Sequence, residues 1–220
     1  MEFTLQSLPE GTALLCMALI VWALWSDWRR VAWKSLILGP VPNRLIGTTM
    51  VLTLLWSMGP HLSSGLAFHF LGVTACVLIF GRGVALAALV VASLAACWLH
   101  GGDVWAWPFN FVLLGLFPAW LTSGADRWLQ RHLPNHIFVF IFLNTFLVAG
   151  LVMLAIGCVA TAVLAFQGET LTYLLQNYFP YFLMLGFGEA WLSGLTITLL
   201  IVYWPGWVAS FDDRRFLMNK

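Results

Sequence analysis

The chain has 220 residues, of which 61% are hydrophobic and 9% are charged, and its formal net charge is +1. Because an ordinary soluble domain carries about 25% charged residues, this composition excludes a soluble domain. The near-neutral charge, without a basic patch, gives no indication of nucleic-acid binding. The apolar stretches approach the length of about 20 residues that a membrane-spanning helix needs, so we expect an all-α, multi-pass membrane protein.

Seven apolar stretches predict seven transmembrane helices within one domain that covers residues 1–220. In chain order, the expected spans are Gly11–Trp28, Leu45–Met58, Ser64–Phe80, Gly83–Leu99, Trp105–Thr122, Ile137–Phe166 and Pro180–Trp204. A helix rises about 1.5 Å per residue, so the sixth stretch exceeds the hydrocarbon core, and we expect it to tilt or to extend beyond the core. Leu171–Phe179 is predicted to lie at the outer interface, with Pro180 starting the last span.

The basic residues predict the orientation of these spans. With the N-terminus outside, all ten Lys and Arg residues fall on the inner side: Arg29, Arg30, Lys34, Arg44, Arg82, Arg127, Arg131, Arg214, Arg215 and Lys220. Cytoplasmic loops of membrane proteins are enriched in Lys and Arg. The sequence therefore predicts an outer N-terminus and a cytoplasmic C-terminus. Because residues 1–10 contain no basic residue, the first span is expected to be retained rather than cleaved as a signal peptide.

One acidic residue, Glu189, lies clearly within a predicted span. It shares a helical face with three neighbours at spacings of three or four residues, which are Gly186, Ser193 and Thr196. An ionisable side chain inside a membrane normally faces the bundle interior or a wet cavity. Two interpretations stay open: Glu189 holds its helix to a neighbour through a hydrogen bond, or it has a charge-dependent role such as a proton-linked gate.

Three histidines are predicted at or near the outer face, which are His61, His69 and His100. Asn110 lies just inside the fifth predicted span on the same side. Imidazole suits divalent transition metals, and an oxygen ligand can complete the shell. These four residues are therefore candidate ligands for cobalt, nickel or zinc. For any one histidine alone, a hydrogen bond between helices is the ordinary alternative.

His69 is also predicted to lie on a helical stripe with Gly65, Gly72 and Cys76, at spacings of four, three and four. The glycines would let a neighbouring helix approach the imidazole closely. Thiolate is a ligand of the same metals, so Cys76 is a further candidate. The alternative for Cys76 is a small apolar residue that packs in the core.

The sequence lacks the motifs of other chemistries. It contains no G-x-x-x-x-G-K-[ST] loop for nucleotide phosphates, no H-E-x-x-H and no G-x-S-x-G. An intramembrane enzyme is therefore the least supported class of function. Any ATP hydrolysis would have to come from a partner.

Three blocks follow one another along the chain, which are His69–Gly81, His100–Gly102 with Asn110, and Glu189–Gly194. The first resembles the block that reads roughly S-H-P-T-G-T-G-L-G-A-I-L-F-G-P in cobalt/nickel-type permeases, the substrate-binding membrane subunits of energy-coupling factor ABC transporters. The second resembles the H-G-G block of the same family, and the third its acidic-small-x-x-small-Gly element. The C-terminal stretch, from Tyr203-Trp204-Pro205 through Phe211-Asp212-Asp213-Arg214-Arg215, looks like that of a divergent branch of these permeases.

The resemblance implies seven helices with an outer N-terminus, in a bacterial inner membrane. It implies a subunit that captures a transition-metal ion, has no permanently bound cofactor and is not an enzyme. Its implied partners are membrane lipid, a transmembrane coupling protein and cytoplasmic ATPase subunits.

The resemblance also implies that His69 is a metal ligand, because it matches a metal-binding histidine of the family. Metal-binding members of the family begin Met-His, and their terminal amine, that histidine and nearby backbone atoms together bind the ion. This chain begins Met1-Glu2-Phe3 instead. We therefore expect His61, His100 and Asn110 to assist His69. The alternative function is a non-transporting membrane metal-handling or assembly factor built on the same fold.

Overall fold

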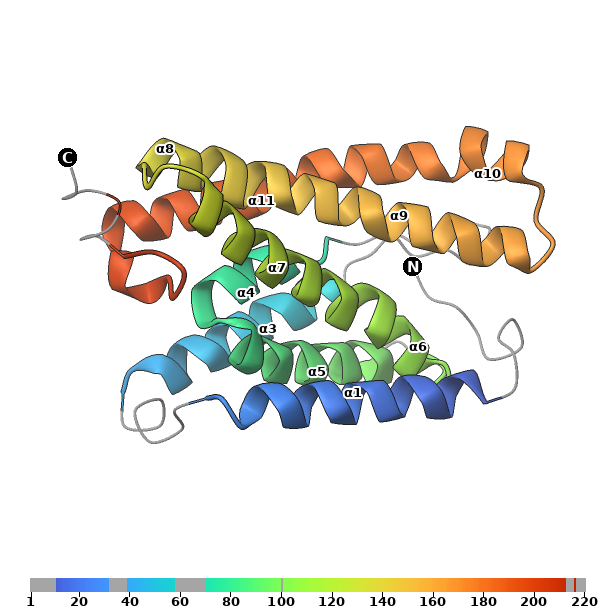
Figure 1. Cartoon of the computed structure of the whole chain (residues 1–220). Helices are drawn as coiled ribbons and strands as arrows, with labels where there is room; N and C mark the ends of the chain where they lie inside the picture. Colours follow the sequence, from blue (N-terminus) through green and yellow to red (C-terminus); the bar gives the residue numbers. More distant parts are fainter. Residues whose placement is uncertain (1–10, 32–38, 58–69, 100, 213–215, 217–220) are drawn as a thin grey trace. The chain divides into compact units, whose positions relative to one another are not determined.

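The computed structural model of the chain describes residues 11–31, 39–57, 70–99, 101–212 and 216. Within those ranges every regular element is a helix, which confirms the all-α prediction (Figure 1). The chain folds into two compact units. The first is made of Met1–Val73 and Arg82–Leu116, and the second of Thr74–Gly81 and Phe117–Lys220.

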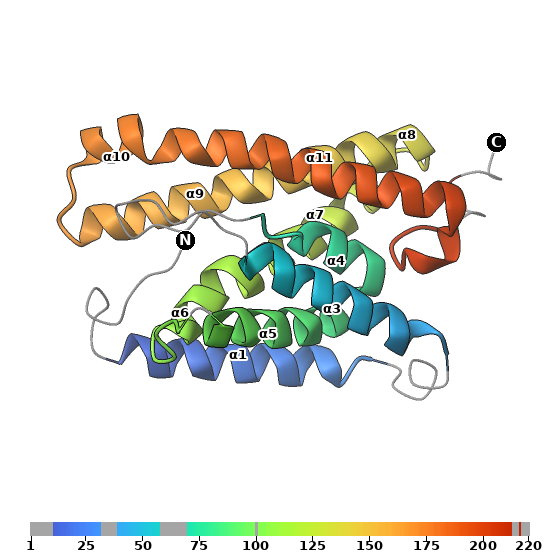
Figure 2. The same ribbon diagram turned by 180° about the vertical axis from the view of Figure 1, so that it is seen from behind.

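The first unit contains α1 (Thr12–Trp28), α3 (Val41–Ser57), α5 (Arg82–Leu99), α6 (Trp107–Phe111) and the π-helix η2 (Val112–Leu116). α1 packs against α5 and α6, and α3 packs against α5. Figures 1 and 2 show α1 and α5 side by side. The buried face of α5 carries alanines at spacings of three or four residues, which let neighbouring backbones approach closely: Ala85, Ala88, Ala92 and Ala96.

An ion pair joins α1 to α5. Arg82 Nε donates to Asp27 Oδ2 at 2.8 Å, and a terminal guanidinium nitrogen donates to Oδ1 at 2.5 Å. The Asp27 side chain is only 5% exposed, and this two-pronged contact gives each carboxylate oxygen a donor. Trp28 Nε1 also donates to the Gly83 carbonyl at 3.0 Å. A Cβ on Gly83 would lie 2.8 Å from Val31 Cγ2, so glycine permits this close approach.

The second unit contains α4 (Val73–Phe80, apart from its first residue), α7 (Phe117–His132), α8 (Ile137–Val139), the π-helix η3 (Phe140–Leu147), α9 (Val148–Phe166), α10 (Leu171–Asn177), α11 (Phe179–Tyr203) and the 3-10 turn η4 (Pro205–Trp207). α8, η3 and α9 follow one another without a break as a helix of 30 residues. α11 runs beside α9 and η3 (Figures 1 and 2). α7 packs against α9 and η3.

Glycines bring α9 and α11 into close contact. A Cβ on Gly150 would lie 3.4 Å from the Gly186 carbonyl oxygen, and a Cβ on Gly186 would lie 3.2 Å from that of Gly150. Further along the pair, a Cβ on Gly157 would lie 2.5 Å from Cγ of Phe182, whose ring is fully buried. Small residues of this kind let helices pack tightly in a membrane.

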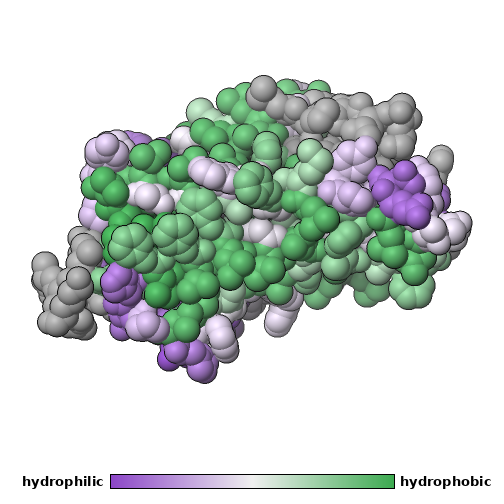
Figure 3. Space-filling model, turned by 90° about the horizontal axis from the view of Figure 1, so that it is seen from above, coloured by the Kyte–Doolittle hydropathy of each residue, from purple (hydrophilic) through white to green (hydrophobic). Residues whose placement is uncertain are grey.

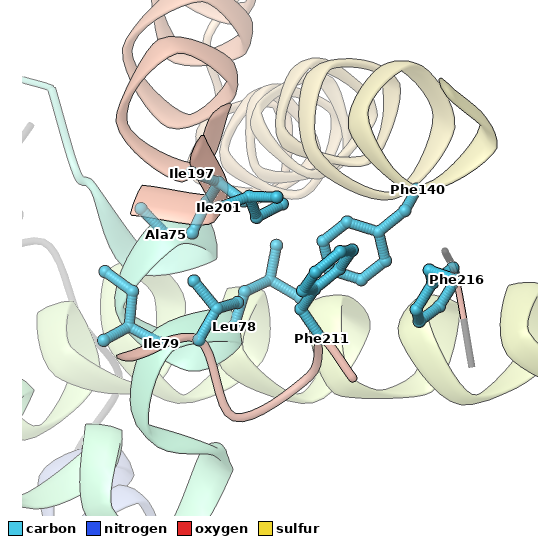
Figure 4. Close-up of a cluster of buried hydrophobic side chains, with 9 residues drawn as sticks. Ala75, Leu78, Ile79, Phe140, Ile197, Ile201, Phe211 and Phe216 are labelled. Carbon is cyan, nitrogen blue, oxygen red and sulfur yellow. The ribbon is translucent and has the colours of Figure 1, made fainter. Parts of the chain in front are cut away.

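A hydrophobic core in the second unit gathers side chains from four parts of the chain (Figure 4). α4, η3, α11 and the segment after η4 contribute Ala75, Leu78, Ile79, Phe140, Ile197, Ile201, Val208, Phe211 and Phe216. Phe140 meets Phe211 edge-on at 5.3 Å between ring centroids, and Phe211 stacks on Phe216 at 5.1 Å. The C-terminal segment is therefore part of the core.

The helices fit a membrane. Within the described residues, three are long and apolar enough to cross one: Arg82–Leu99, Ile137–Phe166 and Leu171–Tyr203. Thr12–Trp28 is a shorter apolar helix. Figure 3 shows a face that is largely hydrophobic, with hydrophilic residues gathered toward its ends. Pro180 lies in the first turn of α11, where the sequence placed the start of the last span. The count of seven spans remains a prediction.

The predicted helix over Ser64–Phe80 is wrong at Phe70–Gly72. α4 begins only at Val73, because Gly72 has a φ of +63° and the two residues before it are not helical. Residues 64–69 lie outside the described part of the chain. The predicted stripe is therefore wrong between Gly72 and Cys76, because the helix that carries Cys76 does not continue through Gly72.

The close contact of Gly157 with Phe182 gives a test of the α9–α11 packing. Gly157→Ala should lower stability by about 1–3 kcal/mol, the usual range for an overpacked core, because Cβ and Cγ of Phe182 cannot swing away as a ring edge could. The control is Gly124→Ala in α7, where an added Cβ has no heavy atom within 4 Å and alanine favours the helix. Thermal unfolding in detergent measures both, and an equal midpoint for both would contradict the packing.

Candidate functional site

The predicted metal ligands fall mostly outside the described residues. His61, His69 and His100 all lie there, whereas the candidates Asn110 and Cys76 are described. Asn110 is half-buried in α6. Among the described residues, no group of three or more His, Cys, Asp or Glu side chains could hold a metal ion. The metal site therefore remains a prediction from the sequence.

α6, which carries Asn110, is held to α5 by a buried hydrogen bond. Trp107 Nε1 donates to Ser93 Oγ at 3.1 Å, and the Trp107 ring stacks on Phe111 at 5.4 Å between centroids. Pro108 occupies the first turn of the helix, where its missing N–H leaves no bond unmade. These contacts fix the helix on which Asn110 lies, one turn after Trp107.

The chain that follows His69 is also held in place. Trp56 Nε1, from α3, donates to the Leu71 carbonyl at 2.9 Å in a buried position. A Cβ on Gly72 would lie 3.0 Å from Leu52 Cδ2. Glycine adopts the positive φ of this turn without strain. These contacts fix Leu71 and Gly72, and Cys76 lies buried in α4 with 1% exposure.

The intramembrane carboxyl is buried, as the helical pattern predicted. Glu189 is 3% exposed and Ser193 is 0% exposed, and both share the buried face of α11 with Gly186. Thr196 is half-buried. Ser193 Oγ is buried without a hydrogen-bond partner among the described protein atoms. This face is a polar strip on a helix that is otherwise largely apolar.

A second set of polar groups, partly buried, connects η3 to α7, and sequence reasoning missed it. Asn144 Nδ2 donates to Asp126 Oδ1 at 2.5 Å, and Gln130 Nε2 donates to the same oxygen at 2.7 Å. Asn144 is 2% exposed, and its Oδ1 has no partner among the described protein atoms. The available signal was Asn144-Thr145, a polar pair inside an apolar stretch of 30 residues.

Two further polar pairs were missed for the same reason. Thr74 of α4 and Thr122 of α7 share a buried hydrogen bond of 3.2 Å. Asp27 and Arg82 form the ion pair between α1 and α5. Each partner lies tens of residues from the other in sequence, so no local spacing connects them. Each of these contacts joins one helix to another.

A comparison with known families identifies the chain. The family model CbiM, described as the cobalt uptake substrate-specific transmembrane region, matches residues 7–207. No curated protein and no solved structure matches the chain. The match covers most of the 220 residues and agrees with the apolar helices of the structure. The chain therefore belongs to the CbiM family, the substrate-specific transmembrane component of cobalt uptake.

Proposed function

We propose that this chain is the substrate-capture subunit of an energy-coupling factor ABC transporter in the bacterial inner membrane. Its substrate is a divalent transition-metal ion, and cobalt is the first candidate. The family match over residues 7–207 is the observation that carries this proposal. Long apolar helices with buried polar faces support it, since a membrane subunit of this kind needs both.

The proposed metal site uses His69 as the principal ligand, with His61, His100 and Asn110 completing the shell. Two or three imidazoles with one oxygen suit cobalt, nickel or zinc better than magnesium or calcium. The support from the structure is positional. Trp56 holds the Leu71 carbonyl just after His69, and Trp107 holds the helix of Asn110.

The proposed partners follow from what the sequence lacks. The chain contains no phosphate-binding loop for ATP, so we assign energy supply to cytoplasmic ATPase subunits and their connection to a transmembrane coupling protein. Glu189 is proposed to be an internal polar lock of α11, because it is buried on the face that carries Gly186 and Ser193.

The metal site is tested by replacing one histidine at a time. His69→Ala should abolish stoichiometric Co²⁺ binding in calorimetry, while the protein still inserts and folds. The control is His132→Ala: His132 is exposed on α7, with its Nδ1 at 2.8 Å from the Trp128 carbonyl oxygen and its ring stacked on Trp128. Binding to the wild type should weaken as the pH falls through about 6.5, because the ligands must be neutral imidazoles. A wild type that binds no divalent metal would instead favour the non-transporting factor.

The orientation is tested with reporter fusions. The inner placement of every Lys and Arg predicts that a fusion at Asp103 lies outside and one at Arg131 lies inside. An alkaline phosphatase reporter should be active only at Asp103, and a green fluorescent protein reporter should fluoresce only at Arg131. If the fusions at Asp103 and Arg131 report the same side of the membrane, the seven-span topology is contradicted.

The role of Glu189 is tested by two substitutions of different polarity. Glu189→Gln keeps the hydrogen-bonding shape, so it should stay close to the wild type in detergent unfolding and in cobalt uptake. Glu189→Leu removes one partner of a buried polar contact, which typically costs about 1–3 kcal/mol, and should lower the unfolding midpoint. Equal and complete loss of uptake in both variants, with intact folding, would mean that the charge itself is needed.

A further inference from the structure

The C-terminal half of α7 has one face that is fixed to the rest of the second unit. This face carries Thr122, Asp126 and Gln130, at spacings of four residues. Thr122 shares a buried hydrogen bond with α4. Asp126 accepts from Asn144 of η3 at 2.5 Å. Gln130 donates to the Ser210 carbonyl at 3.2 Å. The polar groups on this side of the helix are therefore used in contacts within the protein.

The other face of the same stretch is exposed and basic. It carries Arg127, Trp128, Arg131 and His132, all of which are exposed. Arg127 and Arg131 are one helical turn apart, as are Trp128 and His132. Trp128 is 57% exposed, and its ring stacks on that of His132 at 4.9 Å between centroids. We call these four residues the basic face of α7.

The two arginines of this face have no counter-charge from the part of the chain that the structure describes. Arg127 Nε donates to the Ser123 carbonyl of its own helix at 3.0 Å. Neither Arg127 nor Arg131 forms an ion pair with a described carboxylate. Asp126, their neighbour in sequence, is bonded instead to Asn144 on the inner side. Two positive charges thus stand close together on an exposed surface.

This basic face lies at one end of the helices that are long enough to cross a membrane. The helix Ile137–Phe166 begins shortly after α7 ends at His132. Figures 1 and 2 show the end of α7, the start of α8 and the end of α11 at the same end of the α9–α11 pair. Tyr203 and Trp204 are 65% and 53% exposed there, and Trp204 stacks on Trp207 at 5.4 Å between centroids. Exposed Tyr and Trp at the ends of apolar helices are typical of the headgroup level of a bilayer.

We propose that the basic face of α7 binds the headgroup of an anionic phospholipid in the surrounding membrane. A guanidinium group can donate two parallel N–H bonds to a phosphate, and basic residues beside membrane-crossing helices are attracted to anionic lipid. Trp128 rests at the boundary between headgroups and acyl chains, which suits an apolar ring with a polar N–H. The bound headgroup holds the outer face of α7 as Asp126 and Gln130 hold the inner one. This site is independent of the metal ion and of which side of the membrane α7 faces.

The experiment titrates the full-length protein in detergent micelles with two lipids. Phosphatidylglycerol is anionic and phosphatidylcholine is zwitterionic, and native mass spectrometry counts the lipid bound to each protein molecule. Arg127→Gln combined with Arg131→Gln removes both charges of the basic face. Arg29→Gln combined with Arg30→Gln is the matched control, because it removes two exposed charges at the end of α1 in the first unit.

Two further arms separate a lipid site from simpler explanations. Arg127→Lys combined with Arg131→Lys keeps both charges, so it reports whether a loss in the Gln variant comes from charge or from a disturbed helix. Inorganic phosphate, added as a competitor, reports whether the face binds any free anion instead of a lipid. Thermal unfolding in detergent is measured for every variant.

The wild type should bind phosphatidylglycerol at least fivefold more tightly than phosphatidylcholine, and inorganic phosphate should not displace it. The Arg127 and Arg131 Gln variant should lose this preference at an unchanged unfolding midpoint, because both side chains are exposed. The Lys variant and the Arg29 and Arg30 control should stay within twofold of the wild type.

Four results would overturn the proposal. A wild type without a preference for the anionic lipid has no such site. An equal loss in the Arg29 and Arg30 control would mean that total charge alone attracts the lipid. A Lys variant as weak as the Gln variant would trace the loss to the helix rather than to charge. Displacement by inorganic phosphate would mean that the face binds a free anion.

Discussion

Close helix contact is the constraint on which the second unit depends. Lipid is as apolar as the side chains that face it, so membrane helices gain little from hydrophobic burial and associate through tight packing instead. α9 and α11 meet this need at Gly150 and Gly186, where each backbone lies within reach of an added Cβ on the other helix. Glu189 and Ser193 are buried on the same face of α11, so the glycine contact also determines where these polar groups lie.

Polar groups inside such a structure have to find partners within the protein, because an unpaired group in hydrocarbon is strongly unfavourable. The chain meets this requirement between elements that are distant in sequence. Asp27 pairs with Arg82 from α5, and Asp126 accepts from Asn144 of η3. Two carbonyls at the end of α4, of Leu78 and Ile79, receive N–H groups from the C-terminal segment at Ser210 and Ala209. Each contact connects helices that apolar packing alone would leave free to slide.

The sequence predicts the features that depend on local composition. The stretch Ile137–Phe166 forms a continuous helix with those bounds, and Pro180 opens α11, because apolar length and proline geometry act within one segment. The prediction fails at Gly72, where an apolar stretch turns sharply. Glycine is compatible with both a helix and such a turn, and the choice depends on Trp56 and Leu52 from another helix. The buried polar pairs could not be predicted either, since their partners meet only after folding. The histidine site rests on family resemblance and residue chemistry.

The π-helix η3 has a consequence for how sequences of this family are aligned. Val148 N donates to the Leu143 carbonyl, five residues back, so the helix turns through fewer degrees per residue here than an α-helix does. A period of 3.6 residues carried forward from Ile137 therefore assigns residues beyond Leu147 to the wrong face. A relative with a plain α-helix at this place would match Gly150 and Gly157 only with a one-residue gap inside Phe140–Leu147.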